Sequence, residues 1–195
     1  MFSSSKSNGG RPAKNPLPPR IAALLRESWW FALLALALYL LLILLTYHKS
    51  DPGWSHSLRA TTIHNAGGVV GAYVADLMLY VFGLSAYWWV VFCAALVWLG
   101  FRRIETVRDI DRRSHAVAAI GFVIVLMASS GVEAIRMYTL KATLPLVPGG
   151  VLGAVVGEAL SKSLGFTGGT LILLMLFIAG LGLFTGVSWL TVIER

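Results

Sequence analysis

Hydrophobic residues are gathered into four long runs, and polar stretches separate each run from the next. The runs cover about 28–47, 77–100, 116–132 and 170–190. A helix crosses the hydrocarbon core of a membrane with about 20 apolar residues, within a range of about 17–25. A membrane β-strand alternates apolar and polar side chains, whereas residues 31–38 are apolar without a break. The pattern therefore predicts an all-α integral membrane protein with four transmembrane helices.

A shorter apolar segment lies ahead of the fourth run, at about 150–165, and begins at a Pro-Gly-Gly sequence. Its apolar side chains recur at the i, i+4 spacing of one helix face. About 15 residues are too few for a straight crossing, so we expect an amphipathic or re-entrant helix that either lies on the membrane or dips into it. Gly153 and Gly157 would give this helix a flat face for a neighbour.

Positive charge is distributed unevenly among the polar stretches. Of 16 Lys and Arg residues, five precede the first run, two lie in the first loop, five in the second and three in the third. Cytoplasmic flanks of membrane proteins carry the excess of Lys and Arg. Both termini are therefore predicted to be cytoplasmic, and the short helix falls in the second external loop. Topology and contact with membrane lipid account for the net charge of +7, so no nucleic-acid surface is expected.

The beginning of the chain differs in composition from the rest. Residues 1–20 are rich in Ser, Gly, Pro and basic residues, and such a composition cannot bury a core. We interpret residues 1–27 as a disordered basic cytoplasmic tail and residues 28–195 as the four-helix membrane domain.

The most distinctive residues lie between the first two runs. An Asp-Pro-Gly sequence at 51–53 is a turn signal, the Trp that follows suits a membrane interface, and the glycines allow positive φ or close backbone approach. The aspartate at the start of the second run is either a solvated boundary residue or a packed one. This set is either a partner-facing surface or an internally packed structural loop, and it comprises Asp51, Pro52, Trp54, Asn65, Gly68, Gly71 and Asp76.

Further glycines are candidates for close packing between helices. Small residues spaced four apart let two helix backbones approach each other within a membrane. The candidates are Gly83, Gly153, Gly157, Gly182 and Gly186.

Residues that carry chemistry are scarce. The chain has one cysteine, Cys93, and three of its four histidines, His48, His56 and His64, fall eight residues apart in the first loop. A zinc site needs three or four converging ligands, and the sequence offers no cysteine or close His pair to support one. It also lacks the phosphate-binding motifs GxxxxGKS/T and GxGxxG. We therefore expect no metal site, no cofactor and no catalytic residue in this segment.

Two classes of function fit these observations. The first is a membrane anchor and scaffold, whose distinctive residues serve contacts rather than catalysis. The alternative is a small polytopic transporter or channel subunit. A transporter usually places ionisable residues deep within its spans, whereas Asp76 and Glu133 lie at the edges of the predicted runs, so the anchor is favoured.

Several short motifs occur in a fixed order along the chain. They are DPxWS at 51–55, NxxGxxGAxxAD at 65–76, FGxxAY at 82–87, GGxxG at 149–153, GGT at 168–170 and LFTGxSW at 183–189. Together they resemble the N-terminal membrane region of the FtsK family of septal DNA translocases, over about residues 28–195.

The resemblance implies a role in bacterial cell division. The segment would anchor an ATP-driven chromosome-segregation motor at the division septum of the inner membrane, contact other division proteins and form a homo-oligomer, a hexamer in that family. The family's linker and motor are not found in this sequence. ATP, Mg²⁺ and DNA are therefore expected to bind only to that absent motor, and the segment itself is not expected to be an enzyme.

Overall fold

The computed structural model describes residues 18–56, 62–104, 112–137 and 144–186. Within those residues the chain forms helices and no strand. The elements in order are α1 (Pro19–Leu45), α2 (Gly68–Phe82), the 3₁₀ helix η1 (Gly83–Tyr87), α3 (Trp88–Ile104), α4 (Arg112–Arg136) and α5 (Gly150–Thr185).

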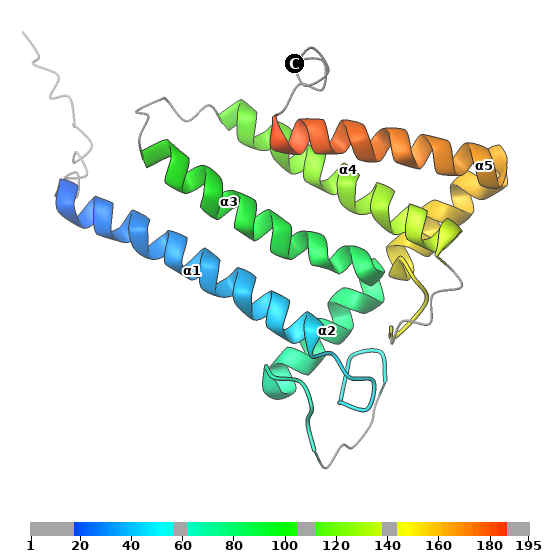
Figure 1. Cartoon of the computed structure of the whole chain (residues 1–195), viewed down its shortest axis with the longest axis horizontal. Coiled ribbons are helices and arrows are strands. Elements are labelled where there is room, and N and C mark those ends of the chain that lie inside the picture. Colours follow the sequence, from blue (N-terminus) through cyan, green and yellow to red (C-terminus); the bar gives the residue numbers. More distant parts are fainter. Residues whose placement is uncertain (1–17, 57–61, 105–111, 138–143, 187–195) are drawn as a thin grey trace, which may run out of the picture.

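Within the described residues, four helical stretches are long and apolar enough to cross a membrane. Figure 1 shows α1, α3, α4 and the last part of α5 running roughly along one common direction. Helix α4 packs against α5, and α1 packs against α3. The prediction of an all-α fold with four spans is therefore confirmed. The stretches are Glu27–Leu45, Gly68–Trp98, Ala116–Arg136 and Gly150–Thr185.

The first helix starts earlier than the hydrophobic run predicts. Helix α1 begins at Pro19, and proline suits the first turn because its fixed φ is already helical and its missing N–H would have no helical partner. Residues 19–27, expected in the disordered tail, are therefore helical. Residues 1–17 of that predicted tail lie outside the described residues.

The second span departs furthest from expectation, because it is not one helix over 77–100. The helical path begins at Gly68 and breaks at Gly83, whose φ of 62° and ψ of −141° no other residue adopts without strain. The chain then passes through η1 into α3, and Figure 1 shows α2 and α3 meeting at an angle. Gly68, Gly71 and Asp76 consequently lie in a helix rather than in a loop, which corrects the prediction.

Helix α5 contains a sharp bend. Gly165 has φ 72° and ψ 173°, so the segment is two helices, 150–164 and 166–185. In Figure 1 the first folds back beside the second at one end of the bundle. The short helix expected at 150–165 is present in the structure. The helix that follows it begins before the predicted start of the fourth run at 170 and ends at Thr185, and residues 187–190 lie outside the described part.

Aromatic side chains join three of the helices. The rings of Phe92 in α3 and Phe122 in α4 stack with centroids 4.4 Å apart, and Phe184 of α5 lies 5.6 Å from Phe122. Trp89 meets the Phe122 ring edge-on at 5.1 Å. Such offset and edge-to-face pairs add to the energy of apolar burial. This cluster holds α3, α4 and α5 together near the end where α5 terminates.

Candidate functional site

The α1–α2 loop, residues 46–67, is organised around the carboxylate of Asp51. This side chain is only 2% exposed. Its Oδ1 accepts hydrogen bonds from the backbone N–H and the ring Nδ1–H of His64, both at 2.9 Å, and its Oδ2 accepts the backbone N–H of Asn65 at 2.7 Å. Burial alone would raise the pKa of Asp51, but these hydrogen bonds hold it below its ordinary value. The carboxylate thus ties the turn after α1 to the segment that leads into α2.

A second buried carboxylate, Asp76 of α2, holds the middle of the loop. It is 1% exposed and accepts hydrogen bonds from the Ser55 N–H at 2.6 Å, the Ser55 hydroxyl at 2.9 Å and the Tyr47 hydroxyl at 3.1 Å. Burial and the neighbouring Asp76 raise the pKa of Tyr47. Of the two interpretations left open for Asp76, the packed one is correct. A buried carboxylate needs such donors, because leaving it unpaired costs far more than the bonds contribute.

Asn65 links the end of α1 to the start of α2. It is 4% exposed, its amide donates to the Ile43 carbonyl at 2.9 Å, and its Oδ1 accepts the Gly67 N–H at 2.9 Å. A Cβ on Gly71 would lie 2.7 Å from that same oxygen. Gly71 is therefore required for close approach. Gly68 has φ 65° and no described atom within 4 Å of an added Cβ, so it is required for its backbone conformation.

The predicted loop residues divide into an internal and an exposed group. Asp51, Asn65 and Asp76 are buried, whereas Trp54 is 69% exposed. Pro52 is partly buried beside Asp51 in the chain. The structure therefore brings three of the predicted polar residues into packed networks and leaves the Trp ring on the surface. A membrane interface is a usual place for an exposed Trp.

The predicted packing glycines behave differently from one another. Cβ atoms on Gly153 and Gly157 would meet the Ser130 carbonyl and the Ala134 side chain of α4, and one on Gly83 would meet the Gly149 backbone. Among the described residues, no atom lies within 4 Å of a Cβ added to Gly186, which ends α5 in a left-handed conformation. The Gly186 N–H bonds the Gly182 carbonyl at 2.9 Å. The packing role of Gly186 and of Gly182 stays a prediction.

Glu133 lies at the edge of its span, as predicted, but sequence reasoning missed its burial. Its side chain is only 7% exposed. It accepts the N–H groups of Leu84 and Gly149 at 2.9 Å and the Ser85 hydroxyl at 2.5 Å. The Glu133 carboxylate therefore accepts hydrogen bonds both from the break between α2 and α3 and from the residue that precedes α5. A lone acid in an apolar run was the available signal.

The fold also brings together two histidines that the sequence keeps apart. The rings of His48 and His64 lie with centroids 4.6 Å apart. One ligand atom from each, together with one from Asp51, lie within 4.8 Å of one another. The expectation of no metal site assumed that no such pair existed, and sequence spacing gave no indication of it.

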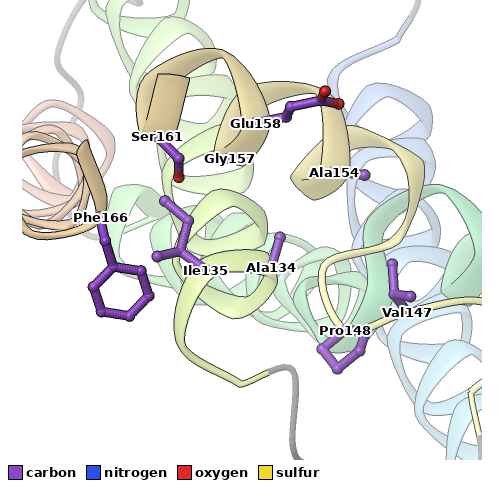
Figure 2. Close-up of a pocket in the computed structure, with 9 residues that line it drawn as sticks. All are labelled: Ala134, Ile135, Val147, Pro148, Ala154, Gly157, Glu158, Ser161 and Phe166. Atoms are coloured by element: carbon purple, nitrogen blue, oxygen red, sulfur yellow. The ribbon is translucent and has the colours of Figure 1, made fainter. Parts of the chain in front are cut away.

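A pocket of about 560 Å³ lies between the end of α4 and the first part of α5. Figure 2 shows Ala134 and Ile135 on one side and Glu158 and Ser161 on the other. Glu158 is the one ionisable side chain among the described residues that line it, and it pairs with Lys162 at 2.6 Å. The lining offers an apolar hollow rather than a set of catalytic groups.

Comparison with known proteins gives a consistent result over nearly the whole chain. The model of one family, the 4TM region of DNA translocase FtsK/SpoIIIE, matches residues 22–195. No solved structure resembles the chain significantly.

Curated relatives carry the same description. A DNA translocase FtsK 2 of Ralstonia nicotianae is 48% identical over 92% of this chain and 24% of its own length. A DNA translocase FtsK of Shewanella oneidensis is 40% identical over 82% of the chain and 17% of its own length. A DNA translocase FtsK of Pseudomonas putida is 34% identical over 97% of this chain and 23% of its own length. The chain therefore spans about a quarter or less of the relatives that it matches.

Proposed function

This chain belongs to the family of 4TM regions of the DNA translocases FtsK and SpoIIIE, and we propose that it anchors such a translocase and acts as a cell-division scaffold. The family match is to a membrane region, so the segment is a multi-pass membrane domain rather than an enzymatic one. In the proposed role it holds an ATP-driven chromosome-segregation motor at the septum of the bacterial inner membrane. DNA, ATP and Mg²⁺ bind only to that motor.

One observation carries this proposal: the region matched by the family coincides with four apolar helical stretches, and a buried polar network in the α1–α2 loop links the first two of them. A linker from a fixed membrane platform raises the local concentration of a tethered motor and favours its assembly. A homo-oligomer, a hexamer by resemblance, would arrange several motors around one DNA molecule. The exposed Trp54, together with Val69 and Val70 of α2, offers contact surface for other division proteins or other copies.

The proposed orientation places both termini in the cytoplasm, because the stretches richest in Lys and Arg flank the same side of the spans. A cysteine scan in a Cys93→Ala background tests it. A membrane-impermeant thiol reagent added to intact cells should label Ser57→Cys and Ser161→Cys but not Ser5→Cys or Asp109→Cys. Labelling of Asp109→Cys in intact cells would contradict this orientation.

The alternative, a small transporter or channel subunit, would need an ionisable side chain available within a span. Two buried carboxylates lie in the described spans, Glu133 and Asp76, and three hydrogen-bond donors of the same chain already occupy each of them. No observation therefore favours this alternative over the anchor.

Complementation tests the scaffold role directly. Cells depleted of their own translocase should divide when supplied with this 195-residue segment alone, and the purified segment should hydrolyse no ATP with or without DNA. A matched control is an unrelated four-span protein at the same membrane level. Filamentous cells despite normal membrane levels of the segment would contradict the proposal, as would DNA-stimulated ATP hydrolysis.

A further inference from the structure

We propose that His48, Asp51 and His64 form a binding site for one zinc ion in the α1–α2 loop. Each residue offers one ligand atom, and the three atoms lie within 4.8 Å of one another. Two imidazole nitrogens and a carboxylate oxygen are ligands that zinc uses in proteins. The site goes beyond the anchoring role and does not depend on it.

The ligands come from two segments that the fold holds in place without the ion. On one side, the backbone N–H of Asp51 bonds the His48 carbonyl at 3.1 Å, which closes the turn that carries both side chains. On the other, Asp51 accepts the backbone N–H groups of His64 and Asn65. The carboxylate is thus fixed by backbone donors, and fixed ligands raise metal affinity because they lose less freedom on binding.

The three ligands need only a small rearrangement to bind zinc. Zinc–nitrogen and zinc–oxygen bonds of about 2.0–2.1 Å place the ligands of a tetrahedral ion about 3.4 Å apart. Asp51 Oδ1 and His64 Nδ1 are already 2.9 Å apart, and the ion would replace the proton that now lies between them. His48 supplies the remaining movement: its exposed ring, which is tilted against His64, exchanges its hydrogen bond to Ser50 for the bond to zinc.

The site leaves a fourth position open on its solvent side. The His64 side chain is 52% exposed, so the ion has a path of entry. The Ser50 hydroxyl lies 2.6 Å from His48 Nδ1 and 3.4 Å from His64 Nδ1, where it can hydrogen-bond a water that fills that position. With the ion bound, metal bonds join the turn after α1, which carries His48 and Asp51, to His64 in the approach to α2, in place of one histidine–carboxylate hydrogen bond.

Zinc binding by the whole chain tests the proposal. The 195-residue protein, freed of any affinity tag and stripped of metal, is titrated with ZnCl₂ in detergent against a chromophoric chelator. The wild type should bind one zinc ion per chain. His48→Ala and His64→Ala should each weaken zinc affinity by at least about tenfold, the lower end of the losses seen even for second-shell changes. His48→Ala is the decisive variant, because its ring is exposed and its loss leaves the bonds of Asp51 intact.

His56→Ala is the matched control, since it removes a histidine of the same loop that is not among the three ligands and that bonds the backbone carbonyl of Asp51 rather than its carboxylate. It should leave zinc affinity unchanged. Cobalt loading adds a spectroscopic measurement: Co²⁺ in the wild type should give the intense visible bands of a four-coordinate ion, and His48→Ala should lose them. The proposal is overturned if the wild type binds no zinc, if His48→Ala binds it as tightly as the wild type, or if His56→Ala loses as much affinity.

Discussion

Replacing Asp76 with alanine should open the α1–α2 loop. The carboxylate accepts three hydrogen bonds, two from Ser55 and one from Tyr47, and it is almost fully buried. Its removal leaves the Ser55 N–H without its acceptor and creates a small cavity beside Gly53, whose added Cβ would lie 2.6 Å from the Asp76 carboxyl carbon.

The loss in the free energy of unfolding expected for Asp76→Ala follows from these three hydrogen bonds. A hydrogen bond to a charged group contributes about 1.5–3 kcal/mol. Because two of the three come from one residue, they are not independent, and we expect the free energy of unfolding to fall by about 3–5 kcal/mol in total, roughly the contribution of two such bonds. Tyr47→Phe deletes only the longest bond, at 3.1 Å, and should lower the free energy of unfolding by about 1.5 kcal/mol, the lower end of that range.

Amide hydrogen exchange in detergent micelles measures the opening of the α1–α2 loop residue by residue. Loops open locally at lower free energy than the whole fold, so protection of the Ser55 N–H reports the network itself. A loss of about 3 kcal/mol corresponds to about 100-fold faster exchange. Asp76→Ala should speed exchange of the Ser55 N–H about 100-fold, and Tyr47→Phe should speed it about tenfold. The reasoning is wrong if Ser55 exchanges in Asp76→Ala at the wild-type rate, or no faster than in Tyr47→Phe.

Three further predictions concern other parts of the structure. Gly71→Val should destabilise the protein by about 1–3 kcal/mol through overpacking, whereas Val70→Leu, at a side chain 68% exposed, should leave the melting temperature unchanged. Gly153→Val should separate α5 from α4 and lower the melting temperature by several degrees, whereas Val155→Leu, 63% exposed, should not; equal melting of the two variants would refute the close packing. The folded-state pKa of Asp51 is below its ordinary value of 3.8. The stability that its carboxylate contributes is therefore complete above pH ~3.8 and is lost as the pH falls through the lowered value. A loss of amide protection in the α1–α2 loop between pH 7 and 5 would contradict this.

The four spans could be predicted from the sequence because a single quantity, the length of an apolar run, decides them. The break at Gly83 could not, since residues on both sides of it are apolar and lipid favours the same composition for a straight helix and for a broken one. The start of α2 at Gly68 was hidden for a related reason: its glycines look like loop residues, although here they give the chain close approach to Asn65 and α1.

The polar contacts were still less predictable. The sequence identified Asp51 and Asp76 as distinctive, but their donors come from residues up to 29 positions away, and only the folded chain determines those partners. Glu133 shows the same limit, since its position near the end of a run says nothing of Leu84 and Gly149, which it joins. The pair of histidines likewise follows from the turn at Asp51 and not from their spacing.

The most direct test of the anchoring claim is where this segment goes in a dividing cell. A fluorescent fusion of the 195-residue chain, without any motor, is imaged beside an unrelated four-span membrane protein at equal expression. The account predicts that the fusion concentrates at the septum while the control stays evenly distributed around the cell. A fusion spread evenly over the membrane of dividing cells, with the early division proteins present at the septum, would contradict it.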